Sequence, residues 1–170
     1  MAIYVSEAKI ITMQDLRLSE HFTLSEFTRS ATADKYGFKN TPNATQIANL
    51  KALCENVLEP LRAYANSISP HPKEESVGVF ISSGFRCHKL NTLVGGAPNS
   101  QHKTGEAADI RIPDIATGNQ WFEWMEDNLQ FDQLIKERAT KTSKSFWIHV
   151  SYKLDPSKNR QQVKFLIKNK

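Results

Sequence analysis

Residues 82–113 of the chain, "SSGFRCHKLNTLVGGAPNSQHKTGEAADIRIP", contain many polar side chains that a hydrophobic core does not need. Arg86, Ser100, His102 and Asp109 stand among glycines, with short apolar runs on either side. Functional residues are concentrated on loops that a rigid scaffold positions. The pattern therefore indicates a site in this part of the chain, with His102 and Asp109 on the two sides of a glycine-containing turn.

Two strands that the sequence predicts bring candidate ligands to one face of a sheet. In "AADIRI", residues 107–112, Asp109 alternates with apolar residues, and His149 does the same in "FWIHVSY", residues 146–152. Because the side chains of a strand alternate between its two faces, each strand has an apolar face for the core and a face that carries a ligand. If the two strands are neighbours, Asp109 and His149 meet on one side of the sheet, and His102 reaches that side from the preceding loop.

Two imidazoles and one carboxylate are the ligand set of a catalytic zinc site. Three protein ligands leave one coordination position for water, whereas a structural zinc site more often has four ligands, frequently thiolates. Neither of the two cysteines, Cys54 and Cys87, is placed to serve such a structural site. The sequence therefore predicts Zn²⁺ bound by His102, Asp109 and His149.

The order of the predicted elements indicates an α+β fold. Helical spacing of apolar residues predicts a helix over 41–67, which Pro60 should interrupt, and a second helix over 117–128. Strands are predicted at 77–83, 107–112, 131–138, 145–152 and 161–168. Helices come first and strands mostly later, which favours a central antiparallel sheet with the N-terminal helices packed on it. No linker divides the chain, so we expect residues 1–170 to form a single domain.

The composition is that of a soluble globular protein, and no apolar run approaches the ~20 residues that span a bilayer. The first residues lack a basic segment followed by an apolar stretch, so we expect no secretory signal peptide and synthesis in the cytoplasm. The net charge of +4 favours anionic partners. No aromatic and basic RNA-binding pattern accompanies this charge, so nucleic acid is not an expected partner. We expect the protein to be a monomer.

The spaced motifs resemble those of the zinc D-alanyl-D-alanine carboxypeptidase family. The pattern is SxHxxGxAxD at residues 100–109, followed by "WIHVSY" at residues 147–152. Further stretches that carry the resemblance are "HFTLSEFTRSATA", "NTP", "VLEPLR", "SSGFR", "LNTLVGGAPNSQHKTGEAADI" and "FDQLIKE", so it covers most of the chain. The family includes VanX-type dipeptidases and phage L-alanyl-D-glutamate endopeptidases. The resemblance implies a fold like that of the hedgehog signalling domain.

The resemblance also implies roles for individual residues. His102, Asp109 and His149 match the zinc ligands of the family. Arg86 matches an arginine that holds a substrate carboxylate or carbonyl oxygen near the metal. Ser100 matches a serine that hydrogen-bonds in the substrate cleft.

The general base is the point at which this sequence departs from the family. Relatives often carry an acidic residue three positions before the last histidine, and Phe146, which cannot accept a proton, occupies that position here. Glu137, at the end of "FDQLIKE", is therefore the candidate base, and Asp132 near its start is the second candidate. Trp147 shares a strand face with His149 and either walls the cleft as a substrate-binding residue or covers the sheet.

Together these features predict a zinc metallopeptidase, a hydrolase that degrades the cell wall by cleaving stem peptides of peptidoglycan. D-Ala-D-Ala carboxypeptidase and endolysin-type endopeptidase both stay open, because the two activities need the same metal. We expect a phage- or prophage-encoded lysis enzyme that reaches the wall or periplasm through a membrane lesion. The alternative is a non-catalytic zinc-containing module that binds the wall or forms part of a virion, which Phe146 keeps open.

Overall fold

The computed structural model describes residues 16–69 and 77–167 of the chain. Residues 1–15, where the sequence predicts no signal peptide, lie outside this part. No described helix combines the length and the apolar character that are needed to cross a bilayer.

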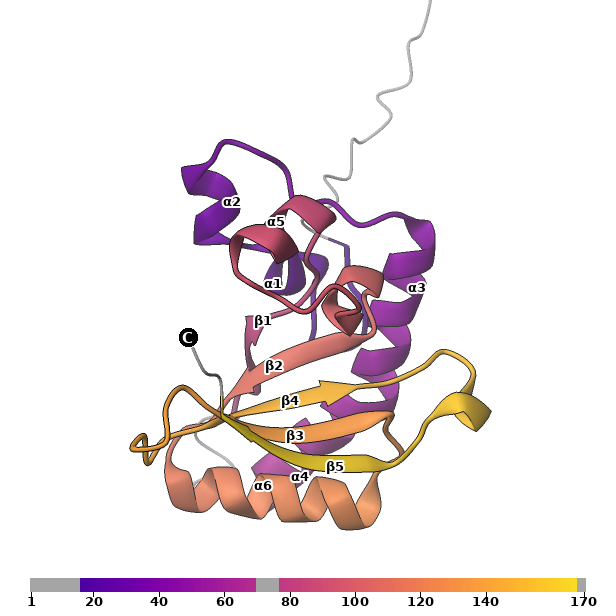
Figure 1. Cartoon of the computed structure of the whole chain (residues 1–170). Coiled ribbons are helices and arrows are strands. Elements are labelled where there is room, and N and C mark those ends of the chain that lie inside the picture. The colour runs from indigo at the N-terminus through magenta and orange to yellow at the C-terminus, as the bar shows by residue number, and fades with distance from the viewer. Residues whose placement is uncertain (1–15, 70–76, 168–170) are drawn as a thin grey trace, which may run out of the picture.

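Five strands form one sheet in the order β1-β2-β4-β3-β5 (Figure 1). The strands are β1 (Phe80–Ser83), β2 (Ala107–Arg111), β3 (Gln133–Arg138), β4 (Trp147–Ser151) and β5 (Gln162–Ile167). The first four pair antiparallel, whereas β5 pairs parallel to β3. Strand β4 ends beside the start of β3, and β5 begins there as well. The connection over residues 152–161 therefore passes the start of β3 and enters β5 on its far side.

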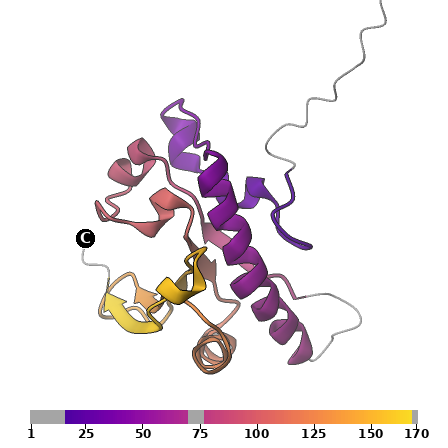
Figure 2. The same ribbon diagram turned by 90° about the vertical axis from the view of Figure 1, so that its right-hand side faces the viewer.

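The helices lie mainly on one side of the sheet. They are α1 (Leu24–Thr28), α2 (Ala31–Lys35), α3 (Ala44–Leu53), α4 (Glu59–Ser67), α5 (His88–Leu93) and α6 (Ile115–Asn128). Figure 2 shows α3 and α4 as one long rod beside the sheet, with α6 seen end-on. A π-helical turn, η2 (Cys54–Leu58), joins α3 to α4 just before Pro60. The predicted interruption of the helix is thus present, as a wider turn next to a residue without an amide hydrogen.

The hydrophobic core fills the space between these helices and one face of the sheet. Ile110 of β2 and Ile148 of β4 are fully buried there, in one cluster with Leu50, Leu58 and Trp121. Because neighbouring residues of a strand point to opposite faces, the other face of β2 and β4 is free to carry polar groups. The α+β fold with N-terminal helices packed on a central sheet is confirmed, and the sheet is antiparallel as predicted except for β5, which pairs parallel to β3.

Candidate metal centre

His102 is positioned by a short 3-10 turn, η3 (Gln101–Thr104), that leads into β2. The turn ends at Gly105, whose φ of 75° lies in the left-handed region and whose Cβ, if it had one, would lie 2.5 Å from the carbonyl oxygen of Gln46. The His102 side chain is buried, and its Nδ1 lies 2.6 Å from the carbonyl oxygen of Gly84. Because a carbonyl oxygen can only accept, Nδ1 carries the hydrogen, and Nε2 presents its lone pair to the site.

Asp109 and His149 stand directly opposite each other in the antiparallel pair β2–β4. Nδ1 of His149 lies 2.8 Å from Oδ1 of Asp109, and Nε2 of His102 lies 3.2 Å from the same oxygen. The condition set by the sequence, that the two strands are neighbours, is met. The three predicted ligands therefore come together on the polar face of the sheet.

The donor set fits a metal ion. One ligand atom from each of the three buried residues lies within 4.8 Å of the others. Ligand atoms around a tetrahedral zinc ion are about 3.3 Å apart when the metal–ligand bonds are about 2.0–2.1 Å. Two imidazole nitrogens and one carboxylate oxygen suit a divalent transition metal. His102, Asp109 and His149 could hold such an ion and leave a coordination position open.

Arg86 completes the surroundings of Asp109. Its Nη2 donates to Oδ2 of Asp109 at 2.9 Å, and its Nε donates to the Ser83 hydroxyl at 2.9 Å. The two carboxylate oxygens thus have separate partners, with Oδ1 toward the histidines and Oδ2 toward the guanidinium. Such outer partners orient metal ligands.

The electrostatics of the site favour the protonation states that bind metal. Burial alone would raise the pKa of Asp109, but its contacts with His102 and His149 hold that pKa well below its usual range. Burial lowers the pKa of His102, which favours the neutral imidazole. A carboxylate and a neutral imidazole are the forms that coordinate a metal.

The site opens into a cleft of about 340 Å³. Arg86, Ser100 and Glu137 line it together with the three candidate ligands. Glu137 stands opposite Trp147 in the pair β3–β4, which makes it a diagonal neighbour of His149 on the same face. Diagonal neighbours are about 7–8 Å apart, within reach of a long side chain. The structure therefore brings the first candidate base to the cleft.

Other residues of the cleft wall were not anticipated from the sequence. They include Gln101, Gln133, Leu166, Ile167 and the loop over residues 95–97. Strand alternation could have identified Gln133, since it shares a face with Glu137. The last two residues of β5 depend on the parallel pairing with β3, for which the local sequence holds no pattern.

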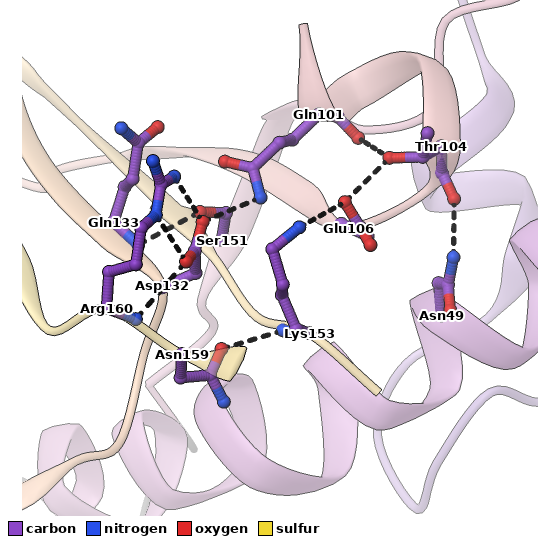
Figure 3. Close-up of polar contacts among 10 residues, drawn as sticks. All are labelled: Asn49, Gln101, Thr104, Glu106, Asp132, Gln133, Ser151, Lys153, Asn159 and Arg160. Atoms are coloured by element: carbon purple, nitrogen blue, oxygen red, sulfur yellow. Dashed lines mark hydrogen bonds and ion pairs between the residues drawn. The ribbon is translucent and has the colours of Figure 1, made fainter. Parts of the chain in front are cut away.

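Two of the sequence candidates do not line the cleft. Asp132 lies just before β3 with no exposed surface, and Arg160 and Gln101 donate hydrogen bonds to it (Figure 3). Trp147 is half-buried at the start of β4, beyond the cleft lining. Neither residue is therefore part of the cleft wall, although Trp147 lies two residues before His149 on the same face of β4.

Phe146 belongs to the hydrophobic core. Its side chain is 5% exposed, and the ammonium of Lys136 lies 4.7 Å from the centre of its ring. The position at which relatives often carry an acidic residue is thus part of the packing in this protein. An aromatic side chain suits this buried position. Because it cannot accept a proton, another residue must serve as the general base.

The comparisons with known proteins agree with these observations. The family model described as Peptidase M15 matches residues 20–151, which span the described helices, the cleft loop and strands β1 to β4. A search of curated proteins finds no match to the chain. With a match over most of its length, the chain belongs to the M15 family of peptidases.

Proposed function

We propose that the protein is a zinc-dependent peptidase that hydrolyses peptide bonds in the stem peptides of peptidoglycan. The observation that carries this proposal is the convergence of His102, Asp109 and His149 at a cleft that Glu137 also lines. Membership of a peptidase family gives the reaction class. The donor set favours zinc, because two imidazoles and a carboxylate with an open position are typical of catalytic zinc sites.

When bound at these ligands, a zinc ion would polarise a peptide carbonyl and lower the pKa of a water molecule to about 7. The protein contributes the remaining groups. Glu137 accepts the proton of the attacking water and returns it to the leaving amine, as a general base and then a general acid. Its place on the face of His149 puts its carboxylate in the cleft where that transfer takes place.

In this proposal Arg86 orients the ligand Asp109 and also binds the substrate. Its bonds to Asp109 and Ser83 fix the guanidinium at the cleft wall. A guanidinium has five N–H donors in a rigid fork, and these two bonds use two of them. The other donors serve to hold a substrate carboxylate or the developing oxyanion. Ser100, which also lines the cleft, supplies a hydroxyl for substrate binding.

The activity is to be tested by digestion of purified peptidoglycan fragments, followed by mass spectrometry of the products. Loss of a terminal alanine identifies a D-Ala-D-Ala carboxypeptidase, and release of the stem peptide identifies an endolysin-type endopeptidase acting at the wall. Activity should disappear with a chelator and return with Zn²⁺. If metal binds but no peptide bond is cleaved in any fragment, the protein is a wall-binding or virion module instead.

A further inference from the structure

Asp132 is a buried carboxylate outside the cleft that is fully engaged as an acceptor (Figure 3). The main-chain N–H of Arg160 donates to it at 3.2 Å, Nε at 2.8 Å and Nη2 at 2.6 Å. The fourth donor is Nε2 of Gln101 at 2.9 Å. Burial alone would raise the pKa of Asp132, but the hydrogen bonds from Arg160 and Gln101 lower it, so the group is ionised at neutral pH.

Gln101 connects this carboxylate to the metal centre. It is the residue directly before His102 in η3, and it is one of the residues that line the cleft. An ionised carboxylate can only accept hydrogen bonds. The NH₂ group of the Gln101 amide, and not its oxygen, therefore faces Asp132. The side-chain oxygen of Gln101 has no hydrogen-bond partner among residues 16–69 and 77–167. Asp132 is thus what holds the Gln101 side chain.

The other end of the same turn is held by different groups. Asn49 of α3 donates to the carbonyl oxygen of Thr104 at 2.9 Å. Thr104 also donates to Glu106, whose carboxylate lies 3.4 Å from the ammonium of Lys153 (Figure 3). His102 lies between these two anchors. Removal of Asp132 frees the Gln101 side chain, whereas the Gln101 carbonyl oxygen still accepts from the Thr104 hydroxyl and the Glu106 amide, at 3.0 Å each.

We propose that Asp132 is a positioning residue that holds the metal ligand His102 in place through Gln101. The proposal rests on the function proposed above in that it treats His102 as a metal ligand. Partners of this kind, one step away from a ligand, typically change metal affinity by about 10–100-fold when they are removed.

The test is a double-mutant cycle with Asp132→Asn, Gln101→Ala and the double variant, with Zn²⁺ affinity measured by competition with a chromophoric chelator. Each single variant should weaken Zn²⁺ binding about 10-fold, and the double variant should bind no more weakly than the weaker single one. Additive losses, or wild-type affinity in Asp132→Asn, would overturn the proposal.

Glu59→Gln is the matched control, because Glu59 is also a carboxylate that accepts hydrogen bonds, from the Ser19 hydroxyl and the His21 amide, but it lies away from η3. Its Zn²⁺ affinity should stay within about twofold of wild type, since it has no contact with the metal ligands. A loss as large as in Asp132→Asn would show a general effect of stability and would contradict the proposal.

A second readout needs no metal. The amide of Arg86 donates to the carbonyl oxygen of His102 at 3.0 Å, and the amide of Tyr152 donates to that of Glu106 at 2.9 Å. In apo Gln101→Ala, hydrogen exchange should accelerate at Arg86 and stay unchanged at Tyr152. Unchanged exchange at both amides contradicts the proposal, even if the wild type binds no Zn²⁺ and the proposed function fails.

Discussion

Asp109 and Asp132 are both buried carboxylates at the sheet, and each of them is paired with an arginine. Their other partners differ. Asp109 shares an oxygen with two imidazole nitrogens at the cleft, whereas the side-chain partners of Asp132 within residues 16–69 and 77–167 are N–H donors of Arg160 and Gln101. The pKa of each is lowered.

The difference shows that burial and a lowered pKa do not by themselves identify a catalytic carboxylate. The N–H groups around Asp132 occupy the lone pairs of its carboxylate oxygens, so these oxygens cannot also bind a proton or a metal ion. Imidazole nitrogens can offer lone pairs, so the surroundings of Asp109 can coordinate an ion. The chemistry of the partner atoms therefore distinguishes Asp109, as a candidate metal ligand, from Asp132, as a carboxylate that only accepts hydrogen bonds.

The largest expected effect comes from exchanging the two carboxylates for amides. Asp109→Asn should lose bound metal and at least about 10³-fold in activity, because the metal contributes several kcal/mol of transition-state stabilisation. Asp132→Asn should retain one metal ion at saturating Zn²⁺. Metal analysis and peptide release measure both. Stoichiometric metal in Asp109→Asn would remove Asp109 from the ligand set.

The second prediction compares the two candidates for the general base. Glu137→Gln should reduce kcat by about 10²–10⁴-fold with full metal occupancy, since the amide cannot accept the proton. Asp132→Asn should reduce it much less, because Asp132 lies outside the cleft. Gln133→Ala, a change on the same face of β3, is the control for altered cleft shape. A nearly inactive Asp132→Asn beside an active Glu137→Gln reverses the assignment.

The third prediction compares the two arginines. Arg86→Lys should lower activity about 10–100-fold at saturating Zn²⁺, because a lysine cannot span Asp109 and Ser83 and loses a charged hydrogen bond. Arg160 donates to the fully buried Asp132 with both Nε and Nη2, so Arg160→Lys loses a charged hydrogen bond and should cost about 1–3 kcal/mol in the free energy of unfolding. Steady-state kinetics and urea unfolding measure these effects. Equal activity of Arg86→Lys and wild type would make Arg86 a structural residue.

The smallest effect is a pH dependence of stability. The pKa of folded Asp132 lies below its value in the unfolded chain, which is about 3.9, so its contribution to stability is complete well above that value. The contribution is lost as the pH falls through the folded pKa. The difference in unfolding free energy between wild type and Asp132→Asn should therefore be constant between about pH 5 and 7 and shrink below about pH 4. Urea titrations across this range measure it, and a difference that grows in acid would refute the pairing.

Local patterns in the sequence predict much of the fold and the metal centre. Alternation places Asp109 and His149 on the polar faces of their strands, and the turn before β2 brings His102 to them. Phe146 is also explained, because its side chain packs in the core. These features depend on residues near one another in the chain, or on the spacing of motifs.

The rest depends on pairings between distant segments. Nothing near Asp132 in the sequence indicates that Arg160 and Gln101 are its partners. The same holds for the parallel addition of β5, which brings Leu166 to the cleft. Local sequence fixes the face of a strand but not the identity of its neighbours.

Gly105 has a consequence for how mutational scans of this protein are interpreted. Its backbone angle disfavours any side chain, and the close approach of Gln46 leaves no space for one. Every substitution there should displace His102 and reduce function as severely as the loss of a ligand. A scan scored by activity alone would therefore rank Gly105 among the catalytic residues, although it has no side chain with which to take part in the chemistry. Metal occupancy scored in parallel would separate Gly105 from Glu137, whose substitution leaves the metal bound, but not from the three metal ligands.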